Sequence, residues 1–306
     1  MKERIENSLT LEEILSNKKY DVNYYQREYR WGRKQIEQLI DDLKNAFDES
    51  LSANKVNELS AIENFGYYYM GTIIVTGNQD VKSIIDGQQR LTSMTLLLIA
   101  LNNLHKKYPC SLDFQDLDSL IYSLRMGKKS FNINVEEWKL CLNALFNGED
   151  YNPDLDLESV QNICKRYKDI IELLEEHFDE NGIVNGDKIS LFACWLVYKT
   201  IFIKITTRSD QDAHKVFVSM NDRGLSLNNS EMLKGYILSE IKDDTQRNYA
   251  NSVWKEIVLK LKRSSGLETE GIFNTEDVNF ISTWIRANMP TKFVKERKGQ
   301  KMKTMR

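Results

Sequence analysis

The spacing of apolar side chains divides the chain into segments with a helical period and segments with a strand period. One set with helical spacing predicts an amphipathic helix from Gln35 onward: Ile36, Leu39, Ile40, Leu43 and Phe47. Residues 67–76, "YYYMGTIIVT", and 81–86, "VKSIID", are rich in β-branched and aromatic side chains, and "GNQD" between them has turn chemistry. These two runs predict a β-hairpin. Residues 91–108 are apolar on nearly every side, which predicts a buried central helix.

Most of the remaining chain has helical spacing. Thr10 precedes Glu13 by three positions, which is the capping-box signature of a short helix. Residues 113–197 carry apolar side chains three and four apart almost throughout, and we interpret them as a helical insertion. Residues 199–206 then return to strand composition.

The C-terminal part alternates helices with one polar loop. Helices are predicted at 212–220 and 228–241, the second capped by Asn228 with Glu231 three positions later, and "NDRGLSL" joins them. Two more amphipathic helices are predicted around Trp254 and Trp284. The basic tail "TKFVKERKGQKMKTMR" ends without a domain-like stop, so we expect a native chain that continues past Arg306.

Together these elements predict an α+β fold. Its small mixed sheet is built from the 67–86 hairpin, the 199–206 strand and residues near 20, and helices surround and interrupt it. We expect three regions, which are a core at 1–110 and 195–245, a helical insertion at 111–194, and the start of a helical C-terminal region at 246–306.

Composition excludes several classes of protein. The formal charge of -3 comes from 42 basic and 45 acidic residues, so a polyanion would need a local patch rather than the whole surface. The four cysteines form no CxxC pair, which argues against a zinc ribbon or a disulfide-dense secreted fold and favours reduced, buried thiols. The longest apolar run, "LLLIAL", is too short to span a bilayer. We therefore expect a cytoplasmic protein with no membrane partner.

The pentapeptide "DGQQR", Asp86 to Arg90, stands between the second hairpin strand and the central helix. The N-terminus of a helix attracts anions, Gly87 allows close approach of the backbone, and Arg90 can make a two-pronged contact with a phosphate. Gln88 and Gln89 can donate hydrogen bonds to a phosphate or read a base, while Asp86 can hold a hydrated divalent ion or orient Arg90. The alternative is a strand-to-helix turn whose polar side chains only satisfy the loop.

Two further polar segments also allow two interpretations each. "YYQREYRW", residues 24–31, interleaves arginines with aromatic rings, which suits base stacking and phosphate binding or a packed cation–π cluster under a loop. "NDRG", residues 221–224, is either a second ligand loop or a capped helix–helix turn with Gly224 at a positive φ. His105, His177 and His214 have no metal or triad spacing, and neither a P-loop nor an HExxH motif occurs, so a protein nucleophile or a zinc site is disfavoured.

Three separated motifs resemble one known family, the N-terminal domain of the GmrSD type of modification-dependent restriction enzyme. "YYQREYRW" is similar to its YQR-x-Y-x-W signature, "SIIDGQQRLTSM" to its IDGQQRLTT core, and "VFVSMNDRGLSL" to its F-x-x-x-N-x-RG-x-x-L motif. The resemblance covers roughly residues 8 to 240, with the insertion matched only in character. Glu28, Asn228 and Glu231 depart from the family pattern at caps and turns, which concerns fine geometry more than chemistry.

The resemblance implies a ParB-like nucleotide-binding fold that serves in bacterial defence against phage and uses DGQQR to bind and hydrolyse nucleoside triphosphates. It also implies that residues of all three motifs converge on one nucleotide: Gln26, Arg27, Asp86, Gly87, Gln88, Gln89, Arg90, Asn221, Arg223 and Gly224. In this interpretation Arg27 and Arg90 bind phosphates, and Arg223 closes the site from the other half. Asp86 holds magnesium or the attacking water, and Gln88 with Gln89 positions nucleotide and water.

The family usually has a separate C-terminal HNH nuclease domain that cuts modified DNA, and no such His-plus-Asn motif occurs in this chain. The leading hypothesis is therefore an NTP-binding and NTP-hydrolysing regulatory domain that uses GTP, ATP or CTP with Mg²⁺. Its expected partners are modified phage DNA, an HNH nuclease and a second copy of the chain. One alternative is a nucleotide or modified-DNA switch without turnover, and another is a ParB-like nuclease with metal-dependent nicking activity.

Overall fold

The computed structural model of the chain places the predicted hairpin at the centre of a mixed sheet. Within the described residues this sheet has six strands in the order β1-β10-β3-β4-β2-β7. The strands are β1 (Ser8–Thr10), β2 (Tyr20–Val22), β3 (Tyr68–Thr76), β4 (Lys82–Asp86), β7 (Ile133–Asn134) and β10 (Thr200–Thr207). β3 pairs antiparallel with β4 and parallel with β10, and β2 pairs parallel with both β4 and β7. The predicted α+β class and the predicted members of the sheet are confirmed.

The structure describes residues 3–22, 29–54, 59–77, 81–113, 115–125, 128–154, 156–207, 212, 238, 241 and 243–265. The chain divides into two compact units, the first of which runs to Met220 apart from residues 24–26. The second unit contains residues 24–26 and those from Asn221 onward. Apart from residues 212, 238 and 241, the predicted helices at 212–220 and 228–241 lie outside the described residues, as do the cap at Asn228 with Glu231 and the helix around Trp284.

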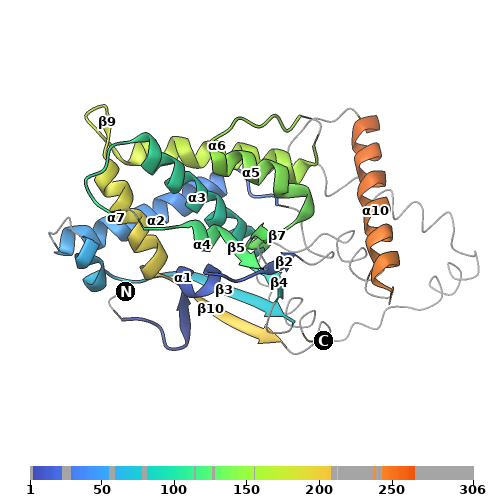
Figure 1. Ribbon diagram of the computed structural model, residues 1–306, viewed down its shortest axis with the longest axis horizontal. Coiled ribbons are helices and arrows are strands. Elements are labelled where there is room, and N and C mark those ends of the chain that lie inside the picture. The colour runs from blue at the N-terminus through green and yellow to red at the C-terminus, as the bar shows by residue number, and fades with distance from the viewer. Residues whose placement is uncertain are drawn as a thin grey trace, which may run out of the picture. The chain divides into compact units, whose positions relative to one another are not determined.

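A layer of helices covers one face of the sheet in the first unit (Figure 1). Its members are α1 (Leu11–Leu15), α2 (Arg33–Asn54), α3 (Gln88–Lys107), α4 (Asp118–Ile121), α5 (Lys139–Asn147), α6 (Glu158–His177) and α7 (Gly186–Lys199), with 3₁₀ turns at Leu59–Asn64 and Glu136–Trp138. In the second unit, α10 (Asp244–Ser265) confirms the helix predicted around Trp254.

The central helix α3 has neighbours on several sides. It packs against α4, α5, α6 and α7, and every residue from Leu91 to Leu101 is buried. Because a helix that is apolar all round must be enclosed, its sequence alone required this arrangement. The start of α3 is therefore held in place by the whole helical layer.

The interpretation of residues 113–197 as almost wholly helical is wrong in part. β5 (Tyr122–Arg125) and β6 (Lys128–Phe131) form a hairpin, β7 joins the edge of the main sheet, and β8 (Asp179–Glu180) pairs with β9 (Ile183–Val184). The stretch "DSLIYSL" was ambiguous because a short apolar run fits either period. Tertiary pairing decided its structure, since the Tyr122 ring stacks on Phe131 across the hairpin with a centroid distance of 4.4 Å.

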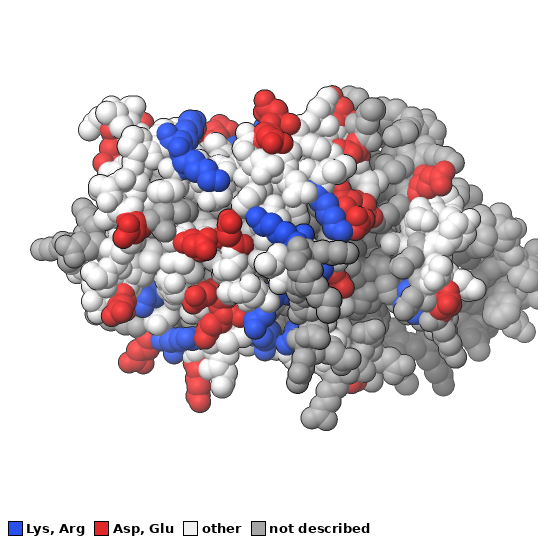
Figure 2. All heavy atoms as spheres, viewed as in Figure 1, with Lys and Arg blue, Asp and Glu red and all other residues white. Residues whose placement is uncertain are grey.

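Charge is distributed rather than concentrated on the face that Figure 2 draws, where acidic and basic side chains are interspersed. This agrees with the nearly balanced numbers of basic and acidic residues. Any anion would therefore have to be bound by a few local groups rather than by the charge of the whole surface. Among the described helices, none combines the length and the hydropathy needed to cross a membrane.

The capping box predicted at the start of α1 is confirmed, and it provides a test of the fold. The Thr10 hydroxyl accepts a hydrogen bond from the Glu13 N–H at 3.2 Å, and the Glu13 carboxylate accepts one from the Thr10 N–H at 2.7 Å. Thr10→Ala should lower the free energy of unfolding by about 1 kcal/mol because α1 loses its cap. Denaturant titration should show Thr10→Ser, which keeps the hydroxyl, closer to wild type; equal losses in both variants would contradict the capping role.

Candidate functional site

The polar pentapeptide forms the junction between β4 and α3. Asp86 is the last residue of β4, Gly87 is the N-cap, and Gln88 is the first residue of α3. Gly87 has φ +92°, and a Cβ at this position would lie 2.7 Å from Cγ2 of Ile73 on the neighbouring strand. Glycine is required here for two reasons, because an L side chain is strained at this φ and would also collide with β3.

The start of α3 has an unusual electrostatic pattern. Gly87 offers no side-chain hydrogen bond as a cap, and the first turn contains no acidic residue. Arg90 lies in that turn, where a cation meets the positive end of the helix macrodipole and is disfavoured. Helices are normally stabilised by the opposite arrangement, so this junction favours an anion that can satisfy both the helix terminus and Arg90.

Within the described residues, two groups contact the Arg90 guanidinium, and neither contact is close. Nη2 lies 3.3 Å from the Asp86 carboxylate, and Nη1 donates to the Met70 carbonyl at 3.3 Å. The side chains of Arg90 and Asp86 are 26% and 30% exposed, respectively. The guanidinium is therefore oriented by the protein but still reachable from solvent.

A bulge in β3 creates the space for Arg90. In the pairing with β10, Tyr69 faces Ile201 and Gly71 faces Phe202, so Met70 is an extra residue on β3. Gly71 has φ +120°, and a Cβ on it would lie 2.0 Å from Arg90 Nη1. A glycine inside a strand pattern is the sequence signal for such a bulge, and the sequence interpretation did not use it.

The two glutamines have different environments. Gln88 is buried, with 6% of its surface exposed. The side-chain oxygen of Gln89 accepts hydrogen bonds from the backbone N–H groups of Arg30 at 2.8 Å and Trp31 at 3.3 Å. Gln89 thus joins the DGQQR junction to the end of the "YYQREYRW" motif, two segments far apart in sequence.

Tyr29, also in that motif, packs inside the protein. It is fully buried, its hydroxyl lies 2.8 Å from the Ser93 hydroxyl of α3, and its ring meets Trp138 edge-on at 6.5 Å. Burial raises the pKa of Tyr29, so the phenol stays protonated. Of the two interpretations of this motif, packing describes Tyr29, while residues 23–28 lie outside the described residues.

Two side chains of helix α6 also form hydrogen bonds with the end of the first motif. Asn162 donates from Nδ2 to the Tyr29 carbonyl at 3.2 Å, and Arg166 donates from Nη1 to the Trp31 carbonyl at 3.4 Å. Arg166 is itself 8% exposed and is paired with Asp169 through Nε. The sequence interpretation did not predict Asn162 or Arg166, because nothing local marks a helix residue that bonds a distant loop.

The other predicted site residues are not placed by the structure. Gln26 and Arg27 from the first motif, and Asn221, Arg223 and Gly224 from the third, lie outside the described residues. The convergence of the three motifs on one nucleotide therefore stays a prediction. What the structure does bring together is Asp86 to Arg90 with the end of the first motif.

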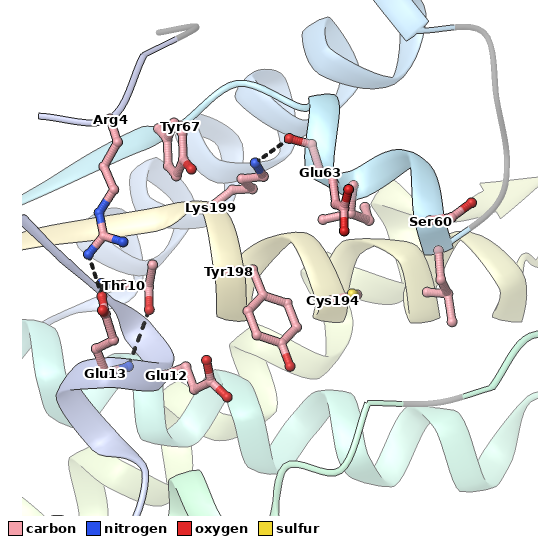
Figure 3. Close-up of a pocket in the computed structure, with 12 residues that line it drawn as sticks. Arg4, Thr10, Glu12, Glu13, Ser60, Glu63, Tyr67, Cys194, Tyr198 and Lys199 are labelled. Atoms are coloured by element: carbon pink, nitrogen blue, oxygen red, sulfur yellow. Dashed lines mark hydrogen bonds and ion pairs between the residues drawn. The ribbon is translucent and has the colours of Figure 1, made fainter.

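A separate concavity of about 460 Å³ lies between the N-terminal segment and the end of α7, and none of the predicted site residues lines it (Figure 3). Its two cationic side chains are engaged with neighbours, since Arg4 pairs with Glu13 and Lys199 donates to the Glu63 carbonyl at 2.7 Å. Within the described part of the chain, no cluster of three or more His, Cys, Asp or Glu side chains is arranged to hold a metal ion.

The fold and the site define a mixed α+β domain with an arginine-bearing polar junction between a strand and a buried helix. The family model described as "GmrSD restriction endonuclease, N-terminal domain" matches residues 11–238, which is about three quarters of the chain and includes all three motifs. The chain belongs to this family and is therefore a domain of a restriction system, a class of proteins that serves in defence. No curated protein matches the sequence.

The close approach of Gly71 to Arg90 can be tested by adding one methyl group. Gly71→Ala combines a disfavoured φ with a collision against the guanidinium, and should lower the free energy of unfolding on the order of 2 kcal/mol. Gly148→Ala is the matched control, because Gly148 has φ +72° but no heavy atom within 4 Å of its added Cβ.

A double variant separates strain from collision. In an Arg90→Ala background, Gly71→Ala should cost less than in the wild type, since the colliding group is gone. Denaturant unfolding of the four proteins of this cycle measures the difference. Strictly additive losses would show that the contact between Gly71 and Arg90 is not energetically significant.

The role of Gln89 as an acceptor predicts a local effect. Gln89→Ala should destabilise the domain by about 1 kcal/mol, because two backbone N–H groups lose their partner. Hydrogen exchange at the amides of Arg30 and Trp31 should accelerate more than exchange elsewhere. Gln89→Glu retains an accepting oxygen and should protect both amides; unchanged exchange in Gln89→Ala would contradict the assignment.

Proposed function

We propose that this restriction-system domain binds a nucleoside triphosphate with Mg²⁺ at the β4–α3 junction and hydrolyses it to regulate a partner nuclease. The observation that carries the proposal is Arg90, a partly exposed cation in the first turn of a helix that has no acidic residue in that turn and no side-chain cap. A phosphate at this point would be attracted by the helix terminus and by the guanidinium together.

Each residue of the junction has a role in this proposal. Gly87 gives the turn its positive φ, and its missing Cβ leaves room for Ile73, so that α3 can start directly against β3. Arg90 neutralises phosphate charge, and its contacts with Asp86 and Met70 hold it ready. Gln88 and Gln89 complete the turn, and Gln89 also fixes the loop that follows Gln26 and Arg27 in the chain. We expect Arg27, Asn221, Arg223 and Gly224 to complete the site around the nucleotide.

The residues present are compatible with magnesium. Mg²⁺ keeps several waters and binds through one or two carboxylates together with substrate phosphates, so the single carboxylate of Asp86 suffices. Magnesium would neutralise charge on the phosphates. The chemistry asked of the chain is then positioning and charge neutralisation, which phosphoryl transfer requires more than it requires a protein nucleophile.

A second candidate function is a nucleotide or modified-DNA switch without turnover. It is favoured by the engagement of the junction's acceptors, since the Asp86 carboxylate faces Arg90 and the Gln89 oxygen accepts two backbone N–H groups. The Asp86 carboxylate, which could otherwise act as a general base, is therefore engaged by Arg90. In both proposals the domain controls an HNH nuclease that acts on modified phage DNA.

Arg90→Ala tests the proposal directly. Loss of the contact between the guanidinium and a phosphate should weaken nucleotide affinity by on the order of 2 to 5 kcal/mol, which is more than tenfold in Kd. The measurement is calorimetric titration with GTP, ATP and CTP in the presence of Mg²⁺, with release of inorganic phosphate followed on the same samples. Arg90→Lys should be intermediate, since it keeps the charge but loses the planar fork.

Lys139→Ala provides the charge-matched control. Lys139 is the first residue of α5 and pairs with Glu136 within the described part of the chain, and its removal should leave nucleotide affinity unchanged. Wild-type binding with phosphate release supports the hydrolase, and binding without release supports the switch. An Arg90→Ala protein that melts like wild type and binds nucleotide equally well would refute both.

A further inference from the structure

Two cysteines that are 23 positions apart in sequence meet in the core of the helical insertion. Cys141 of α5 and Cys164 of α6 have their Sγ atoms 3.0 Å apart, and both residues are buried, with 0% and 3% of their surface exposed. Both are free thiols in the structure. A disulfide bond is about 2.05 Å long, so its formation requires an approach of only about 1 Å.

The other two cysteines have different surroundings. Cys110 lies 2.9 Å from the Ser190 hydroxyl, and Cys194 is buried beside the concavity at the end of α7. The sequence favoured four reduced, buried thiols, because no CxxC spacing was present. Only the packing of α5 on α6 shows that two of the four form a pair.

The two thiols differ in acidity. The pKa of Cys164 is lowered by its hydrogen bond with Cys141 and by the positive charge of Lys168, although burial opposes this. The pKa of Cys141 is raised by the same hydrogen bond and by burial. The pair is thus held together by a hydrogen bond between the two sulfur atoms.

We propose that Cys141 and Cys164 form a modification site at which a peroxide makes a reversible disulfide between α5 and α6. The Cys164 thiolate attacks one oxygen of hydrogen peroxide and becomes a sulfenic acid, while the other oxygen leaves as hydroxide and takes up a proton to form water. The Cys141 sulfur then attacks the sulfenic sulfur, the S–S bond forms, and a second water leaves with the Cys141 proton. Two thiols are oxidised and one peroxide is reduced to two waters, and a small dithiol reverses the change.

The position of the pair connects it to the candidate site. Cys164 lies on α6 between Asn162 and Arg166, the two residues that bond the carbonyls of Tyr29 and Trp31. A movement of α6 toward α5 therefore acts on the loop that Gln89 holds from the other side. The disulfide itself does not depend on nucleotide binding, so this inference can be tested even if the proposed function is wrong.

The experiment treats the full chain with hydrogen peroxide, blocks remaining thiols with an alkylating agent in denaturant, and identifies the products by mass spectrometry. We expect loss of two hydrogen atoms, a cross-linked peptide pair that contains Cys141 and Cys164, and full recovery of both thiols after dithiothreitol. The Cys110→Ser/Cys194→Ser variant keeps the pair and should behave identically. Cys141→Ser and Cys164→Ser should each abolish the cross-link.

Hydrogen exchange of the oxidised and reduced wild-type chain tests the connection to the site. We expect at least a twofold difference in exchange rate at the amides of Arg30 and Trp31, and reversal of this difference by dithiothreitol. If Cys141 and Cys164 remain alkylatable after peroxide, or are oxidised singly to sulfinic acid, the modification site is refuted. If the disulfide forms but the exchange of both amides is unchanged, the effect on the loop is refuted.

Discussion

The rest of the site depends on the close approach of the Arg90 guanidinium to Gly71 of β3, a residue that has no side chain. Gly71 must lack a Cβ, and the bulge must leave the Met70 carbonyl available to Nη1. The hairpin then has to bring Asp86 level with Ile74, where its carboxylate can meet Arg90 from the other side. A bulge at each of these pairings re-aims side chains beside a site, as bulges often do.

Burial of α3 makes this arrangement rigid. A helix enclosed on nearly all sides cannot shift along its axis without disturbing the whole layer, so its first turn stays fixed relative to β3 and β4. The placement of a cation in that turn is unfavourable for the isolated helix. The fold retains it because the surrounding packing outweighs a local electrostatic cost, and such local conflicts are typical of functional sites.

The segment that carries α5 and α6 contributes to the candidate site. Its helix α6 bonds the loop that ends the first motif, and a buried pair between Arg166 and Asp169 keeps the donor in place. The paired cysteines join the same helix to α5. Hydrogen bonds thus link the DGQQR junction, the end of the first motif and α6 into one set of contacts, while the third motif lies outside the described residues.

The sequence by itself determined the class of fold, the hairpin, the buried central helix, the α1 cap and the polar junction, because each depends on a local period or a local cap. Tertiary structure decided the strands inside the insertion, since short apolar runs fit either period until a partner strand is present. It alone decided the contacts of Gly71 with Arg90, of Gln89 with Trp31, and of Cys141 with Cys164. These pairs are distant along the chain, and their meeting depends on how strands register and helices pack, which no local pattern encodes.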